Sequence, residues 1–217
     1  MRAIQDTRES IPTAGSSRTL PEFNYSPLPE NHIRVLQLLP NADGNAPIEC
    51  ALIHYPLLDP RKGTHLYEAV SYVWGPPPNT HHLLVDGVCL SIRQNCHAVL
   101  ARLRDPAISR FLWIDAVCIN QEDKDEKTDQ VQLMTWIYAS ARGVLVWLDE
   151  PAETHRTVDD ETRREVAQAL EVIQAAAEDS TQAVNYDTAT AKVNTLSRRS
   201  WFRRIWVRHH VIISLLR

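Results

Sequence analysis

Three polar residues, Asp115, Asn120 and Gln121, interrupt or follow an apolar segment of the chain. Residues 111–117 (FLWIDAV) form a β-rich run of strand length, and Asp115 lies inside it. Ligands of open parallel sheets gather beyond the carboxyl ends of the strands, so a carboxylate and two amides at this place are candidates for catalysis or binding. The structural alternative is that Asp115 pairs with a loop or a buried arginine while Asn120 caps the next helix.

The elements that position these residues form a strand, a helix and a second strand. From residue 122 to residue 141, apolar residues recur every three or four positions, which predicts an amphipathic helix. Its apolar face contains Val131, Met134, Ile137, Tyr138 and Ala141. Residues 144–148 (VLVWL) are a second continuous apolar run. Two such strands joined by a helix predict a right-handed βαβ unit, with parallel strands adjacent or near-adjacent in a buried sheet.

Upstream of this unit the sequence predicts strands at residues 33–39, 48–55, 67–74 and in both halves of 82–91. The first two are predicted to pair as a hairpin. Gly75 and three prolines end the third strand. Asp86-Gly87 between two apolar runs is typical of a type I′ turn, and Asn95 is placed to cap a helix that reaches residue 104.

The two ends of the chain differ from its middle. Residues 1–29 are polar and contain scattered prolines, which predicts a flexible leader before a domain at residues 30–217. Residues 157–179 predict an amphipathic helix with Val166, Leu170, Ile173 and Ala177 on its apolar face. The last apolar run, residues 211–217, is either a final core element or the point where a longer protein is truncated.

Composition and spacing exclude several function classes. A net charge of −4 gives no electrostatic reason to expect a nucleic-acid partner. No apolar run approaches the roughly 20 residues that cross a bilayer, and the N-terminus lacks the apolar core of a signal peptide. The four cysteines lack Cys-x-x-Cys spacing. Together these features predict a cytoplasmic protein without a membrane partner. The nine histidines lack metal-ligand spacing, so no metal site is expected. Walker, Gly-x-Gly-x-x-Gly and Gly-x-Ser-x-Gly sequences are absent.

Three blocks of sequence resemble the fungal heterokaryon incompatibility (HET) domain over about residues 30–212. The first is YEAVSYVWG at residues 67–75, and the second is LWIDAVCINQ at residues 112–121, continued by Glu126 and Gln130. The third contains Arg199, Trp201-Phe202, Arg204 and Trp206. The motif positions are Ser71, Trp74, Gly75, Asn120, Gln121, Gln130 and Arg204.

The resemblance implies a role in fungal non-self recognition and cell-death signalling. It also implies an α/β fold like that of Toll/interleukin-1-receptor (TIR) domains, a flavodoxin-like parallel sheet flanked by helices, here with an N-terminal β-hairpin addition. Some TIR domains cleave NAD, so one alternative is an NAD-cleaving or nucleotide-binding enzyme with Asp115 and Glu126 as catalytic residues, on fold analogy alone. The other alternative is a catalytically inert interaction module that binds protein partners or associates with itself.

The third block departs from the family pattern at two positions. His209 and His210 stand where the family has Gln and Glu. A glycosidic transition state gains from a nearby carboxylate, whereas a neutral imidazole carries no negative charge and a protonated one has the wrong sign. The sequence therefore predicts that the chain does not hydrolyse NAD.

Overall fold

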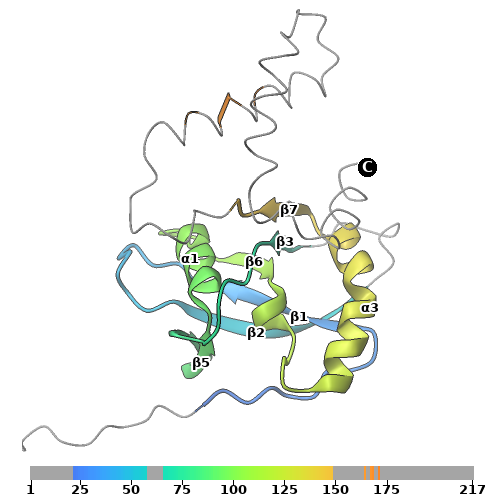
Figure 1. Ribbon diagram of the computed structural model, residues 1–217. Coiled ribbons are helices and arrows are strands. Elements are labelled where there is room, and N and C mark those ends of the chain that lie inside the picture. The colour runs from blue at the N-terminus through green and yellow to red at the C-terminus, as the bar shows by residue number, and fades with distance from the viewer. Residues whose placement is uncertain (1–21, 58–65, 149–163, 165–166, 169–170, 172–217) are drawn as a thin grey trace, which may run out of the picture.

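A computed structural model describes residues 22–57 and 66–148, together with Arg164, Ala167, Gln168 and Glu171, which are helical (Figure 1). In these residues, seven strands form one sheet with the order β5-β4-β2-β1-β6-β3-β7. The strands are β1 (His32–Leu38), β2 (Glu49–Pro56), β3 (Glu68–Ser71), β4 (His81–Val85), β5 (Val88–Ile92), β6 (Arg110–Trp113) and β7 (Gly143–Val146). The helices are α1 (Gln94–Leu103), α2 (Asp115–Cys118) and α3 (Lys124–Ser140).

The part of the sheet that contains β6, β3 and β7 is parallel. β3 pairs in parallel with β6 on one side and with β7 on the other. β6 and β7 are therefore near-adjacent parallel strands connected through α3, as the sequence predicts. Two hydroxyl groups tie this helix and the sheet together: Tyr67 donates to the Ile137 carbonyl at 2.6 Å and Tyr138 donates to the Val70 carbonyl at 3.2 Å.

The rest of the sheet corrects the prediction of a parallel sheet. β1 runs antiparallel to both β2 and β6, and β4 runs antiparallel to β5, so the α/β sheet is mixed. Short connections account for two of these pairs, β1 with β2 and β4 with β5, because a parallel pair needs a long crossover. Asp86 and Gly87 have φ values of 51° and 79°, which confirms the predicted turn between β4 and β5.

Two helices begin differently from the prediction. The Asp123 carboxylate caps α3 by accepting from the N–H groups of Asp125 and Glu126, both at 3.0 Å, so Asn120 is not the cap. α1 begins at Gln94 without a side-chain cap, and Asn95 instead donates to the Val73 carbonyl at 2.9 Å. In both cases the side chain predicted to cap a helix has a different partner nearby.

The buried face of α3 contains Met134, Ile137 and Tyr138 as predicted, and it differs from the prediction at one position. Val131 is 51% exposed, whereas the polar Gln130 is 3% exposed. Gln130 lies four residues before Met134 and therefore shares the face that Met134, Ile137 and Tyr138 turn to the core. Apolar periodicity alone assigned this position to the nearest apolar residue, which was wrong.

The segment before β1 packs on the sheet. Residues 22–29 were predicted to be part of a flexible leader, but the Phe23 N–H donates to the Cys89 carbonyl at 2.9 Å and the Tyr25 hydroxyl donates to the Val117 carbonyl at 3.0 Å. Residues 1–21 and the apolar face predicted for residues 157–179 lie outside the described residues. Among the described helices, none is long and apolar enough to cross a membrane.

Candidate functional site

Asp115 lies past the carboxyl end of β6, not inside a strand as predicted. β6 ends at Trp113, and the N–H groups of Val117 and Cys118 turn back to the Ile114 carbonyl at 3.0 and 2.9 Å, which starts the short helix α2. The Asp115 carboxylate is almost buried, since the residue is 7% exposed. It accepts hydrogen bonds from the Trp74 indole N–H and from the Ala116 N–H, each at 2.8 Å.

Trp74 and Gly75 follow β3, so the first motif block meets Asp115 at the carboxyl edge of the parallel strands. The Arg93 guanidinium lies over the Trp74 ring, 5.2 Å from its centre, and donates to the Gly75 carbonyl at 2.9 Å. Gly75 has a φ of +75°, and a Cβ atom there would lie 2.9 Å from the Asn95 side chain. Backbone conformation and close packing therefore both require glycine at this position.

Asn120 and Gln121 belong to the loop between α2 and α3. The Gln121 amide donates to the Asp115 carbonyl at 2.8 Å, and the Asn120 side-chain oxygen accepts from the Glu122 N–H at 3.2 Å. The Asn120 N–H donates to the Glu126 carboxylate at 2.7 Å. These contacts hold the loop in one conformation from both of its ends.

Glu126 forms a buried ion pair with Arg34, a residue that the sequence analysis did not identify. The Arg34 Nη1 and Nη2 atoms donate to the two Glu126 oxygens at 2.5 and 2.9 Å, and the side chains are 2% and 11% exposed. Arg34 also donates to the carbonyls of Ser26 and Cys118 at 2.6 and 3.3 Å. A charged residue inside the apolar run 33–39 was the available signal, because an arginine buried in a sheet needs a partner.

The structure brings some predicted site residues together and separates others. A hollow of about 290 Å³ is lined in part by Ala116, Asn120 and Gln121. Glu126 lines a different hollow, of about 530 Å³, and Asp115 lines neither of the two. Of the remaining motif positions, Ser71 lies in β3 and is 2% exposed, and Gln130 lies in α3. Arg204, His209 and His210 lie outside the described residues.

Metal binding and thiolate attack are two further chemistries that depend on the residues near this site. In the described part of the chain, no group of three or more His, Cys, Asp or Glu residues is placed to hold a metal ion. Cys118 lies next to the motif loop, but complete burial raises the pKa of its thiol to about 12. A thiol with that pKa stays protonated at neutral pH and is not an activated nucleophile.

Comparison with known proteins shows similarity to a family and to a named relative. The family model described as "Heterokaryon incompatibility protein (HET)" matches residues 67–209. The chain is 36% identical over 145 residues to the Neurospora crassa protein named "Heterokaryon incompatibility protein 6, OR allele". This match covers 61% of the chain and 21% of the relative, so the chain spans about a fifth of that protein's length. No solved structure matches the chain.

Proposed function

The chain belongs to the heterokaryon incompatibility protein (HET) family, and on that premise we propose that it acts in fungal non-self recognition with cell death as the output. The observation that carries the proposal is the family match over residues 67–209, which includes all three sequence blocks. The relative named for heterokaryon incompatibility supports the same role. A cytoplasmic location fits this role.

The contacts between motif residues support a role for the motif as one rigid unit. Trp74, after β3, bonds to Asp115, after β6. Glu126, in α3, bonds to Arg34 in β1. Residues from four elements are thus held in fixed positions around the loop 119–123, and a rigid arrangement of this kind suits recognition of a partner with little loss of conformational entropy.

We further propose that the fold is TIR-like in its parallel half. In chain order, β3, β6 and β7 are the first, second and third parallel strands, and their order in the sheet is second-first-third. Flavodoxin-like sheets begin with the same order, 2-1-3. In this proposal the β1–β2 hairpin is the N-terminal addition, and it pairs with the parallel half through β1 and β6.

Two candidate modes of action follow, and the geometry favours the inert interaction module. Both oxygens of Asp115 and both oxygens of Glu126 accept hydrogen bonds from protein groups, so each acid has a structural task. Protein partners or self-association would then carry the signal. NAD cleavage remains the second candidate because Trp74 and Asp115 lie at the carboxyl ends of parallel strands, where ligands of such sheets bind.

The test is inducible expression of the chain in a filamentous fungus, with cell viability as the readout. Trp74→Phe removes the hydrogen bond to Asp115, whereas Trp136→Phe is a matched control because Trp136 is 48% exposed and outside the motif network. We expect the wild type and Trp136→Phe to kill the host and Trp74→Phe to be harmless at the same protein level. The Neurospora crassa relative is expressed in parallel as a reference. A wild-type chain that is harmless at the protein level of the relative would overturn the proposal. Cellular NAD that stays constant during killing would favour the interaction module, and a fall in NAD before killing would favour the enzyme.

A further inference from the structure

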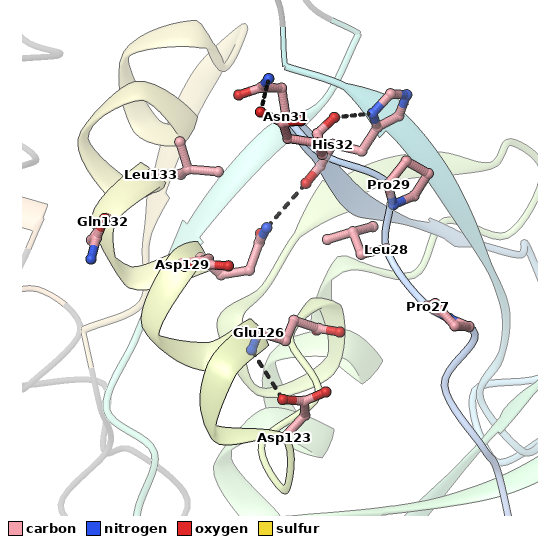
Figure 2. Close-up of a pocket in the computed structure, with 12 residues that line it drawn as sticks. Pro27, Leu28, Pro29, Asn31, His32, Asp123, Glu126, Asp129, Gln132 and Leu133 are labelled. Atoms are coloured by element: carbon pink, nitrogen blue, oxygen red, sulfur yellow. Dashed lines mark hydrogen bonds between the residues drawn. The ribbon is translucent and has the colours of Figure 1, made fainter.

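A hollow of about 530 Å³ lies between α3 and the segment that leads into β1 (Figure 2). It is distinct from the hollow beside Asn120 and Gln121. Figure 2 shows Glu126, Asp129 and Leu133 of α3, with the N-cap Asp123 before them, along one side. The other side is formed by the segment with Pro27, Leu28, Pro29, Asn31 and His32. Its volume is in the range of clefts that hold small ligands, so it has room for a single side chain.

The lining of this hollow is negatively charged. Four of the twelve lining residues carry carboxylates (Glu30, Asp123, Glu126 and Asp129), and none of the twelve is Lys or Arg. Two of these acids have structural tasks, since Asp123 caps α3 and Glu126 binds Arg34. Asp129 lies beyond the first turn of α3, where the helix dipole no longer accounts for it, and among the described residues neither Asp129 nor Glu30 has an ion-pair partner.

Gln130 and His32 offer the hollow further hydrogen-bond acceptors, beside the amide groups of Asn31 and Gln132, which both donate and accept. Gln130 is 3% exposed, and its amide nitrogen donates to the His32 carbonyl at 3.0 Å. Its buried amide oxygen has no donor among the described residues. The His32 Nδ1 lies 2.8 Å from the Glu30 carbonyl, which can only accept, so Nδ1 is the donor and Nε2 of the neutral ring is an acceptor. A ligand that pairs with these two acceptors and with the carboxylates must bring donors.

We propose that this hollow binds an arginine side chain presented by a protein partner. A guanidinium group has five N–H donors, no acceptor and a permanent positive charge, which complements a lining of carboxylates and unpaired acceptors. Leu28 and Leu133 give the hollow apolar walls against which the aliphatic stem of an arginine packs. The same charge disfavours phosphate groups. This inference rests on the hollow alone and does not depend on the proposed cell-death role.

The probe is a fluorescent peptide, acetyl-Ala-Arg-Ala-Arg-Ala, and its binding to the full chain is measured by fluorescence anisotropy. The control peptide carries citrulline, which has nearly the shape of arginine but no charge. We expect binding of the arginine peptide to weaken with salt, because the carboxylates are exposed to solvent. We expect no measurable binding of the citrulline peptide and weaker binding of a lysine peptide, since an ammonium group does not form the paired hydrogen bonds of a guanidinium.

Variants of the chain locate the binding site. Asp129→Asn and Glu30→Gln should each weaken binding by up to about fivefold, and the double variant by roughly tenfold or more, as expected for partly exposed ion pairs. Glu49→Gln is the matched control, because it removes one exposed carboxylate outside the hollow and should leave binding unchanged. Equal binding of the arginine and citrulline peptides, absence of binding by the wild type, or an equal loss in Glu49→Gln would each overturn the proposal.

Discussion

Replacement of Glu126 by Gln tests whether the buried ion pair with Arg34 holds the motif loop to the sheet. The Glu126 carboxylate accepts three hydrogen bonds, two from Arg34 and one from the Asn120 N–H. A glutamine keeps the shape but removes the negative charge beside a guanidinium that is 2% exposed. The substitution therefore leaves a positive charge buried without its counter-ion.

The size of the effect follows from that burial. Removal of one partner from a buried ion pair destabilises a protein by about 3–5 kcal/mol, and for a chain of 150–250 residues this corresponds to a melting temperature lower by about 6–20 °C. The double variant Arg34→Met with Glu126→Leu removes both charges and should recover part of the loss, because burial of the two charges itself opposes folding. The recovery is partial because the Ser26 and Cys118 carbonyls and the Asn120 N–H lose their partners. Glu122→Gln, which removes an exposed acid from the adjacent loop, should change stability by less than about 0.5 kcal/mol.

Thermal and urea unfolding of the purified variants measure these differences. A Glu126→Gln variant that melts within 2 °C of the wild type would refute the argument, because Arg34 would then not depend on this carboxylate. A double variant no more stable than Glu126→Gln would refute the second part, since the unpaired charge would not be the cause of the loss.

Three further predictions concern the fold. Gly75→Ala should destabilise the chain by about 1–2 kcal/mol or more in urea unfolding because of its φ of +75° and the Asn95 side chain, whereas Gly44→Ala, with open space around it, should have little effect. Ile137→Ala should lower the free energy of unfolding by about 2–5 kcal/mol, because Ile137 is fully buried, and a loss below 1 kcal/mol would place this face of α3 outside the core. Native protein at pH 8 should react with iodoacetamide at Cys89, which is half-buried, and not at Cys118, whose pKa burial raises to about 12; mass spectrometry shows which thiol is alkylated. In the unfolded chain the Cys118 thiol ionises near pH 8.5, whereas in the folded chain it stays protonated up to about pH 12. The contribution of Cys118 to the free energy of unfolding is therefore complete below pH 8.5 and falls as the pH rises from about 8.5 to about 12.

Apolar patterns predicted most of the strands, because the apolar side chains that drive the burial of a strand can be read from the sequence of that strand alone. Local sequence predicted the antiparallel strands β4 and β5 on either side of their turn. It also predicted that β6 and β7 are parallel and near-adjacent. Helix starts were less predictable, since each capping side chain has competing partners: Asn95 bonds to Val73, and Asn120 bonds to Glu122. Periodicity also could not distinguish Gln130 from Val131 on α3, because a buried amide with a hydrogen-bond partner substitutes for an apolar residue.

The sequence predicted where in the sheet the candidate site lies, but it did not predict which residues contact each other there. The position of Asp115 after an apolar strand was a local signal, and the structure places it at the predicted edge of the sheet. Its partner Trp74 lies 41 residues away in the sequence, and Arg34 lies 92 residues from Glu126. Contacts over such separations depend on strand order, and the order of seven strands is not determined by the pattern of any one of them.

The positions of the two acids have a mechanical consequence for the loop between them. Asp115 is tied to the end of β3 through Trp74, and Glu126 is tied to β1 through Arg34. β1 and β3 both pair with β6, so the two attachment points belong to one continuous sheet and cannot move apart without breaking strand pairing. Closure of the loop over a ligand would have to break the hydrogen bonds by which Asn120 and Gln121 hold the loop to Glu126 and Asp115. A partner that binds this edge instead meets a surface already in its final shape, which favours recognition by a rigid interface over catalysis by loop closure.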